Sequence, residues 1–283
     1  MGAAPDWLAR ARQQACQPWP AQRWPLLLQG RPIGSLDARI ADKILSFPTS
    51  GNGVQLLKTE HDGQPAWQLT GPSGTPGQAG GPAGDGTAWL NALAQLLRRA
   101  GCCGPWRDEQ VAVCDAQGRR LARVERGALR VLGVATQAVH LVGCTPDGAR
   151  LWLQQRAANK PTHPGAWDTL MGGLVAAADS VEQALARETW EEAGLRLAQL
   201  HDLRPGGQVL LAHPSDEGGP GCGWMAERVW WFRAALAPAL QPQNQDGEVQ
   251  AFACLPHAQV QQRLAAGAFT PEAALVLADF YGW

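Results

Sequence analysis

Residues 172–195 read GGLVAAADSVEQALARETWEEAGL, a stretch that joins a glycine pair to an expected helix rich in acidic residues. Ser180 is followed three residues later by Gln183, which is the capping-box pattern at the start of a helix. Gly194 stands where a residue in the left-handed conformation ends one. The pattern therefore predicts a helix over residues 181–193.

Three glutamates crowd one face of this helix near its C-terminal end. At about 100° per residue, Glu188, Glu191 and Glu192 share one side of the helix. The adjoining arc is expected to face the core and contains Leu185, Ala186, Thr189, Trp190 and Ala193. The acids repel one another and meet the negative end of the helix dipole, at a cost of about 0.3–1 kcal/mol for each effect.

Two interpretations fit this spacing. In the first, the acids form a solvated face, and i,i+4 pairs of Arg187 with Glu191 and of Glu192 with Arg196 return about 0.3–0.5 kcal/mol each. In the second, a divalent cation removes the repulsion, because Mg²⁺ prefers oxygen ligands. The spacing alone leaves both interpretations open.

The composition of the chain excludes several classes of function. The 283 residues have a formal net charge of −1, so no overall field favours nucleic acid or an anionic membrane. We find no apolar segment of signal-peptide or membrane-spanning type. The seven cysteines are scattered and form no C-x-x-C motif, so we expect reduced thiols in a cytoplasmic protein. A homodimer is left open.

The pattern changes character near residue 126 and predicts two domains. Residues 1–126 are expected to form a smaller α+β helper domain, and residues 127–283 a domain with a mixed sheet between helices. A stretch at 71–86 holds seven glycines and three prolines, which is typical of a flexible loop.

A helix is expected after Ser35, where Ile33, Leu36, Ile40, Ile44 and Leu45 recur at helical spacing. Other expected helices cover 89–99, 256–266 and 271–282, and expected strands cover 54–58, 66–70, 109–114, 119–125, 131–143, 149–155, 167–171, 208–212, 228–234 and 249–253.

The acidic helix and the loop before it resemble the Nudix box, G-x5-E-x7-R-E-U-x-E-E-x-G-U, in which U is apolar. Matching positions are Gly173, Arg187, Glu188, Glu191, Glu192 and Gly194. Asp179 replaces the first glutamate, which in the family steadies the box arginine, and Thr189 replaces an apolar residue. Neither departure removes a metal ligand. The resemblance therefore favours the cation interpretation.

Further segments are similar to one Nudix subgroup, which carries an uncharacterised N-terminal extension and is related to thiamine pyrophosphokinase-associated proteins. These segments are GPWRDEQVAV (104–113), VERGALRVLGVATQAVHLVG (124–143), RLWLQQRAANKPTHPGAWDTLMGG (150–173) and NQDGEVQAF (244–252). The subgroup includes plant and fungal proteins similar to hydrolases of oxidised or antagonist forms of thiamine diphosphate. The resemblance implies an α/β fold, a Nudix α/β/α sandwich with a mixed sheet, behind the smaller α+β domain.

The resemblance also implies roles for the box residues. Glu188, Glu191 and Glu192 are expected to bind Mg²⁺ or Mn²⁺, and Gly173 is placed with them at the metal site. Arg187 would hold the acids, oriented by Asp179. Nudix enzymes take their general base either from the box or from a later loop. Glu192 and Glu248 are therefore both candidates.

Four residues outside the box are expected to bind the substrate. Arg156 and Lys160 would contact the diphosphate, because arginine matches phosphate geometry and lysine supplies a point charge. Trp167 and Trp224 offer indole faces that stack on a heteroaromatic ring and attract cations. Ordinary packing is the alternative for both tryptophans.

The expected activity is hydrolysis of a diphosphate linkage in a small molecule. Thiamine diphosphate or its oxidised or antagonist analogues would give a monophosphate and phosphate. A nucleoside-diphosphate-sugar or dinucleotide pyrophosphatase is the alternative enzyme, and it would give two monophosphates. A Nudix-fold binding module without catalysis is a further alternative, although the retained acids argue against it.

Overall fold

The computed structural model describes residues 4–46, 54–71 and 86–283. Almost all of the glycine- and proline-rich stretch at 71–86 lies outside these described residues. The larger sheet has seven strands, five of them in the order β11-β12-β7-β8-β13, with β10 paired to β7 and β9 paired to β8. These strands are β7 (Thr136–Cys144), β8 (Arg150–Arg156), β9 (Trp167–Asp168), β10 (Met171–Leu174), β11 (His201–Ser215), β12 (Gly223–Ala235) and β13 (Val249–Pro256).

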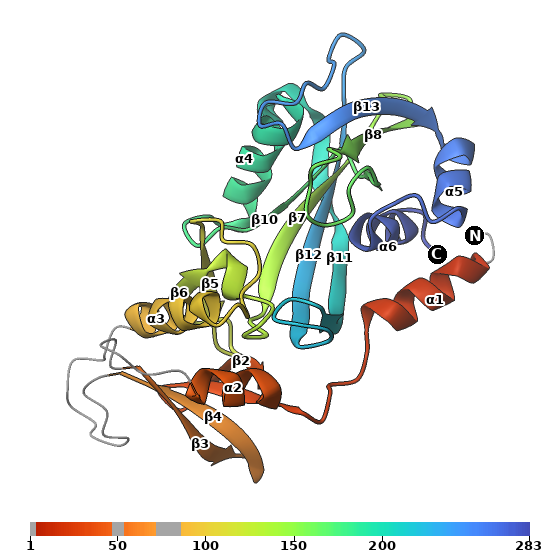
Figure 1. Ribbon diagram of the computed structural model, residues 1–283. Coiled ribbons are helices and arrows are strands. Elements are labelled where there is room, and N and C mark those ends of the chain that lie inside the picture. The colour runs from red at the N-terminus through yellow and green to blue at the C-terminus, as the bar shows by residue number, and fades with distance from the viewer. Residues whose placement is uncertain (1–3, 47–53, 72–85) are drawn as a thin grey trace.

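This sheet is mixed and covered by helices on both faces (Figure 1). The pair β12–β7 is parallel, with Glu227 opposite Thr136, while β10 is antiparallel to β7. The helices beside the sheet are α4 (Val181–Ala193), α5 (His257–Ala265) and α6 (Pro271–Phe280), with a short 3-10 turn η2 (Leu197–Gln199) after α4. Val139 and Leu185 share one buried cluster, whereas Val142 and Val276 share another. Helix α4 therefore packs on one face and α6 on the other, which confirms the α/β/α sandwich.

The N-terminal region builds a second core. Its elements are β1 (Arg23–Leu28), β2 (Arg31–Asp37), α2 (Ala38–Leu45), β3 (Gln55–His61), β4 (Gln64–Thr70), α3 (Gly86–Arg99), β5 (Gln110–Cys114), β6 (Arg120–Glu125) and the 3-10 turn η1 (Arg126–Ala128). Strands β2-β1-β4-β3 form one sheet, and β5 and β6 form a hairpin. Leu36, Trp67 and Leu93 are buried in one cluster with Val124. The region is therefore α+β, as predicted.

Helix α1 (Asp6–Ala15) packs on the second half of the chain. Leu8 is fully buried in the cluster that contains Val276 of α6. Arg12 Nη2 donates to the carbonyl oxygen of Trp283 at 2.6 Å. The domain boundary at residue 126 stays a prediction. None of the helices in the described residues is long and apolar enough to cross a membrane.

Several predicted elements have different bounds in the structure, and some elements were missed. The helix expected after Ser35 starts at Ala38, because Asp37 accepts a hydrogen bond from Arg39 N and caps it. Ile33 and Leu36 therefore belong to strand β2. The strand expected at 131–143 starts only at Thr136, and the strand expected at 208–212 is the middle of the longer β11. Helix α1 and strands β1 and β10 were not predicted, and the strand expected at 167–171 ends at Asp168.

A buried arginine fastens the N-terminal region to the larger sheet. Arg23 is 2% exposed and its Nη2 donates to the carbonyl oxygens of Ser35 at 2.7 Å and Val131 at 3.1 Å. Its Nη1 donates to the carbonyl oxygen of Cys222, just before β12. Burial lowers the pKa of Arg23 to about 10, against the opposing effect of Asp37. The guanidinium thus ties three segments together through backbone oxygens.

Replacing Arg23 by alanine is expected to destabilise the fold strongly. The change leaves buried carbonyl groups without donors, and each costs about 1–3 kcal/mol. We expect the free energy of unfolding in urea to fall by about 3 kcal/mol or more. Arg10→Ala, on the exposed side of α1, serves as the control and should stay within about 0.5 kcal/mol of the wild type. Equal stability of the two variants would contradict the role of Arg23.

Candidate active site

Helix α4 has the caps that its sequence predicts. Gln183 N donates to Ser180 Oγ at 3.2 Å, and Ser180 N donates to Gln183 Oε1 at 2.8 Å. Gly194 ends the helix with a φ of 64°. An alanine Cβ at Gly194 would also lie 2.6 Å from the carbonyl oxygen of Gln243. The helix and its bounds, Val181–Ala193, are confirmed.

Arg187 links the acidic residues of this helix to the preceding loop. Its Nε donates to Asp179 at 2.9 Å, so the shorter side chain reaches the arginine directly. Its Nη1 donates to both Glu188 at 2.8 Å and Glu191 at 3.0 Å, and its Nη2 to Leu174 O at 3.1 Å. Burial alone would lower the pKa of Arg187, but the carboxylates, Glu188 first, raise it above its usual value. One guanidinium thus organises three carboxylates.

Glu188 lies directly against strand β10. A Cβ added at Gly173 would come within 2.0 Å of Glu188 Cδ, so only glycine allows this approach. The Glu188 side chain is 13% exposed. Burial raises its pKa to about 7, although Arg187 opposes the shift. The first glycine of the box therefore makes room for one of its acids.

Glu192 is buried between α4 and the sheet. Its Oε2 accepts from Gly172 N at 2.9 Å and from Gln154 Nε2 at 2.8 Å. Burial raises the pKa of Glu192 to about 8, against the effect of these donors. The pair expected between Glu192 and Arg196 does not form, because the carboxylate points toward the backbone of β10.

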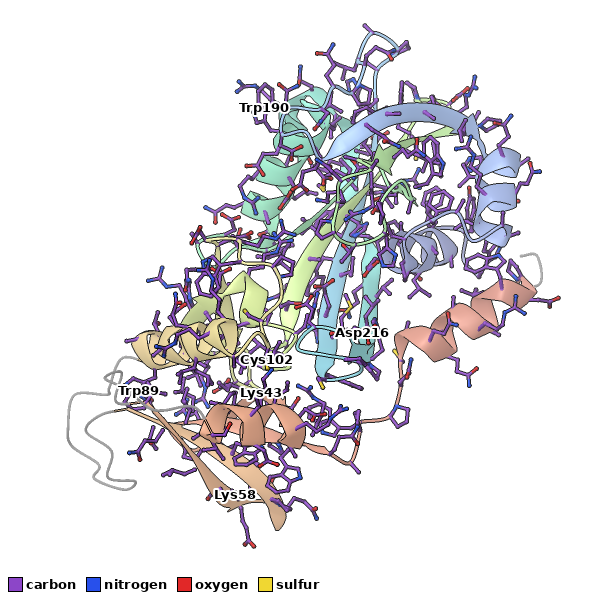
Figure 2. All side chains as sticks on the ribbon, viewed as in Figure 1. Lys43, Lys58, Trp89, Cys102, Trp190 and Asp216 are labelled. Atoms are coloured by element: carbon purple, nitrogen blue, oxygen red, sulfur yellow. The ribbon has the colours of Figure 1, made fainter. Side chains whose placement is uncertain are left out.

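The outer side of α4 differs from the prediction. Trp190 is 44% exposed at the outer end of the helix (Figure 2). Ala186 is exposed as well. The guanidinium carbon of Arg196 lies 5.1 Å from the centroid of the Trp190 ring. The arginine therefore covers the indole face that was expected to pack on the core. Thr189 is fully buried, and its Oγ1 donates to Leu185 O at 2.6 Å. That hydrogen bond lets a polar residue occupy an apolar position of the box.

The loop that carries Glu248 is attached to the end of α4. Gln245 N donates to the carbonyl oxygen of Glu191 at 2.9 Å, and Ala157 N donates to that of Glu248 at 2.8 Å. Lys160 Nζ forms an ion pair with Glu248, whose side chain is 47% exposed. Burial raises the pKa of Glu248, but Lys160 outweighs it and the pKa lies below its usual value. Glu248 and Lys160 therefore stand beside the acidic helix.

The other predicted substrate residues are spread over a wider area. Arg156 donates to the carbonyl oxygen of Thr162 through Nε at 3.3 Å and Nη2 at 3.2 Å. The ring of Trp167 lies 4.3 Å from the guanidinium carbon of Arg263. Trp224 is 2% exposed and its ring centroid lies 5.3 Å from that of Trp19. Trp224 therefore has little surface to offer a substrate ring, and packing explains it.

A buried polar network on the α6 face was not predicted. His140 Nδ1 lies 2.9 Å from Thr169 Oγ1, and Thr270 Oγ1 donates to Asp168 at 3.1 Å. Asp168 also lies 3.9 Å from Arg156 Nη1. These residues come from β7, β8, the end of β9 and the start of α6, so spacing along the chain carried no signal for the network.

The carboxylates of α4 provide suitable ligands for a hard divalent cation. In the part of the chain that the structure describes, no group of three His, Cys, Asp or Glu side chains is arranged so that it could hold a metal ion. Arg187 Nη1 bridges Glu188 and Glu191 instead. Carboxylate oxygens are the ligands Mg²⁺ prefers, and two of these carboxylates, Glu188 and Glu192, have raised pKa values because they are buried. The donor set therefore fits Mg²⁺ or Mn²⁺.

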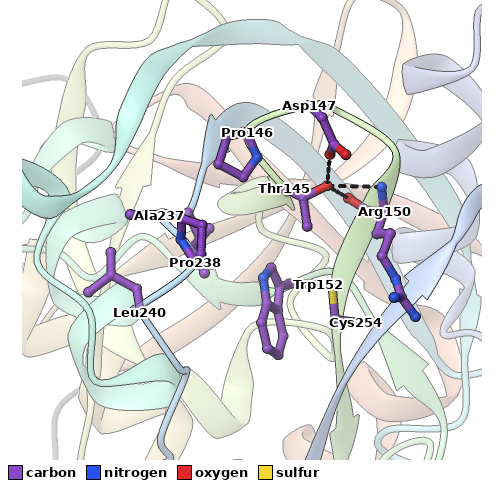
Figure 3. Close-up of a pocket in the computed structure, with 10 residues that line it drawn as sticks. Thr145, Pro146, Asp147, Arg150, Trp152, Ala237, Pro238, Leu240 and Cys254 are labelled. Carbon is purple, nitrogen blue, oxygen red and sulfur yellow. Dashed lines mark hydrogen bonds between the residues drawn. The ribbon is translucent and has the colours of Figure 1, made fainter.

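A separate pocket of about 450 Å³ lies at the turn between β7 and β8. Its lining includes Trp152, Leu240, Pro146 and Arg150 (Figure 3). None of the box residues lines this pocket. The pocket thus gives no support to the expected chemistry.

Comparison with known proteins identifies the family. Residues 135–279 match the model of the NUDIX domain. An uncharacterised Nudix hydrolase of Streptomyces coelicolor is 28% identical over 62% of this chain and 90% of its own length. Nudix hydrolase 20, chloroplastic, of Arabidopsis thaliana is 30% identical over 56% of this chain, but the match spans only 41% of that protein. The chain belongs to the Nudix family and is a hydrolase acting on diphosphate bonds.

Solved structures have only distant similarity to this chain. A Deinococcus radiodurans protein is 20% identical, with a TM-score of 0.43 over 57% of this chain and 92% of that one. The NUDIX domain of Shewanella oneidensis NrtR, complexed with ADP ribose, is also 20% identical, with a TM-score of 0.40 over 53% of this chain and 88% of that one. Similarity at this level concerns the fold alone.

Gly173→Ala tests the close approach of β10 to α4. The added methyl group must displace Glu188 or the strand, and such overpacking costs about 1–3 kcal/mol. We therefore expect a lower midpoint of thermal unfolding. Ala178→Ser, at an exposed position of the same loop, is the matched control with little expected effect. A Gly173→Ala protein as stable as the control would show that Glu188 does not need this space.

Proposed function

We propose that this Nudix hydrolase cleaves a diphosphate linkage with the help of Mg²⁺ or Mn²⁺ held by Glu188, Glu191 and Glu192. The observation that carries the proposal is the bridging of Glu188 and Glu191 by Arg187, which Asp179 orients. A structural helix gains nothing from gathering like charges at its negative end. A site that binds a cation and phosphates gains from these charges, because they attract the cation.

Each box residue then has a defined task. A bound divalent cation neutralises phosphate oxygens and lowers the pKa of water. Arg187 keeps Glu188 and Glu191 on one side of the helix, and Gly173 leaves room for Glu188 beside β10. Because phosphoryl transfer depends mainly on positioning and charge neutralisation, these residues and a few cations suffice.

Glu248 is our choice as the group that takes the proton of the attacking water. Its side chain is 47% exposed, whereas Glu192 is 3% exposed and already accepts two hydrogen bonds. The lowered pKa of Glu248, caused mainly by Lys160 in opposition to burial, keeps its carboxylate ionised at neutral pH. Glu192 remains a ligand in this scheme.

Thiamine diphosphate or its oxidised or antagonist analogues are the proposed substrates, with a monophosphate and phosphate as products. Lys160 and Arg156 lie near Glu248 and would contact the diphosphate. An indole face attracts cations, and because Arg263 already covers one face of Trp167, a cationic ring would have to stack on the other face. A thiazolium ring is such a cation. The similarity of residues 104–113 and 244–252 to the thiamine-associated subgroup supports the same substrate class.

Glu191→Gln is expected to lower the rate of Mg²⁺-dependent phosphate release by about 100-fold or more, by analogy with the loss of one electrostatic contact in a transition state. The assay would measure phosphate and organic products from a panel of diphosphates that includes thiamine diphosphate, a nucleoside-diphosphate sugar and a dinucleotide. Glu182→Gln, exposed in the first turn of α4, is the control. Unchanged turnover in Glu191→Gln would falsify the catalytic assignment. If the products were two monophosphates, the substrate would be a nucleoside-diphosphate sugar or a dinucleotide instead of the proposed class.

A further inference from the structure

The segment between α3 and β5 is attached to the residues that lead into the Nudix domain. Gly104 N donates to the carbonyl oxygen of Gly127 at 2.8 Å, and Arg126 N donates to that of Glu109 at 2.8 Å. Residues 104–109 contain the Trp-Arg-Asp-Glu motif, for which spacing along the chain gives no chemistry. These two backbone hydrogen bonds place Glu109 beside Arg126.

Arg107 and Asp108 do not pair with each other. Asp108 instead accepts a hydrogen bond from Trp106 Nε1 at 2.7 Å, and Arg107 N donates to Glu125 Oε1 at 2.7 Å. The guanidinium carbon of Arg98 lies 4.5 Å from the centroid of the Trp106 ring. The motif is therefore held by its own contacts and presents Glu109 in a fixed position.

Glu109 forms an ion pair with Arg126, with 2.7 Å between Oε2 and Nη1. The side chain of Arg126 is 44% exposed and that of Glu109 is 31% exposed. An exposed pair of this kind contributes about 0–1 kcal/mol, so a stronger anion can replace the carboxylate. A diphosphate is such an anion, and the guanidinium fork matches phosphate oxygens.

The hairpin that follows this motif touches the loop of the Nudix box. Ala177 N donates to the carbonyl oxygen of Gln110 at 3.0 Å, and Arg120 Nη2 donates to that of Ala177. Ala177 lies between Gly173 and Asp179 in the chain. Figure 1 shows β5 and β6 beside the end of α4 at which this loop enters the helix. Arg126 therefore extends from η1, directly after the hairpin that is fixed against the loop of the box.

The charge of Arg126 affects the pKa of two acidic residues of the proposed site. Burial raises the pKa of Glu188 and Arg187 opposes this most, but Arg126 also lowers it. Burial raises the pKa of Glu248 as well, and Arg126 joins Lys160 in lowering it. Glu188 belongs to α4 and Glu248 to the loop before β13. These effects agree with the geometry, in which Arg126 follows directly after the hairpin that contacts the loop of the box at Ala177.

We propose that Arg126 is a diphosphate-binding residue supplied by the region before the Nudix domain, and that Glu109 holds its guanidinium in place until the substrate arrives. This inference rests on the proposed function, because it assigns one more residue to the same site. It gives the N-terminal region a direct part in substrate binding. It also gives the Trp-Arg-Asp-Glu motif a task, which is to hold Glu109 next to Arg126.

The test measures binding of methylenediphosphonate, a diphosphate analogue that is not hydrolysed, by titration calorimetry in the presence of Mg²⁺. We expect Arg126→Ala to weaken this binding by about 10-fold or more, as the loss of a charged hydrogen bond implies. Arg126→Lys should retain part of it. Arg123→Ala, at an exposed position of the same hairpin, is the matched control. Binding by Arg126→Ala within about twofold of the control would overturn the proposal.

Two further measurements separate this proposal from its alternatives. With thiamine diphosphate as substrate, Arg126→Ala should raise KM more than it lowers kcat. Glu109→Gln should leave methylenediphosphonate binding equal or tighter, because the competing carboxylate is gone. If Glu109→Gln weakened binding as much as Arg126→Ala, the pair would only shape the loop, and the proposal would be wrong. If the wild type hydrolysed no diphosphate, the proposed function would fail, while the calorimetric comparison would still decide the role of Arg126.

Discussion

The structure depends on one arginine that holds like charges together. Arg187 bonds Asp179, Glu188 and Glu191, and it also donates to the backbone of β10 at Leu174. Without it, the acids would repel one another at the end of a helix whose dipole already disfavours them. The same guanidinium joins α4 to the strand beside it. The same arginine therefore sets both the position of the acids and the packing of the helix.

The burial of two of the glutamates adds to this constraint. Gly173 allows Glu188 to lie against β10, and Glu192 is enclosed between Gln154 and Gly172. Burial raises the pKa of both glutamates, to about 7 for Glu188 and about 8 for Glu192. Carboxylates in such surroundings gain more from a nearby cation than exposed ones would, because water screens less there. In the proposed function, this burial strengthens the attraction of these residues for a divalent ion.

The parts of the fold that local sequence determines were predicted well, and those that tertiary contacts determine were not. The caps of α4, Ser180 and Gly194, are local, and they fix its bounds. Trp190 was expected in the core, yet it is exposed under Arg196, since periodicity does not show where a core ends. The network of His140 and Asp168 joins elements far apart in the chain, which no spacing rule could connect.

The N-terminal region is attached to the Nudix domain through specific buried contacts. Arg23 bonds backbone oxygens near the start of the larger sheet, and Leu8 of α1 packs against the C-terminal helices. The hairpin of β5 and β6 lies against the loop of the box through Ala177. These contacts involve the larger sheet, the C-terminal helices and the loop of the box. They give the region a fixed orientation from which its charged residues can reach the site.

The most direct test of the central claim is the uptake of Mn²⁺, followed by electron paramagnetic resonance of the free ion. The account predicts that the wild-type protein removes Mn²⁺ from solution and that Glu188→Gln combined with Glu191→Gln abolishes this uptake, while the variant stays folded by circular dichroism. Equal uptake by the two proteins, or none by the wild type, would contradict the claim that these carboxylates bind a cation.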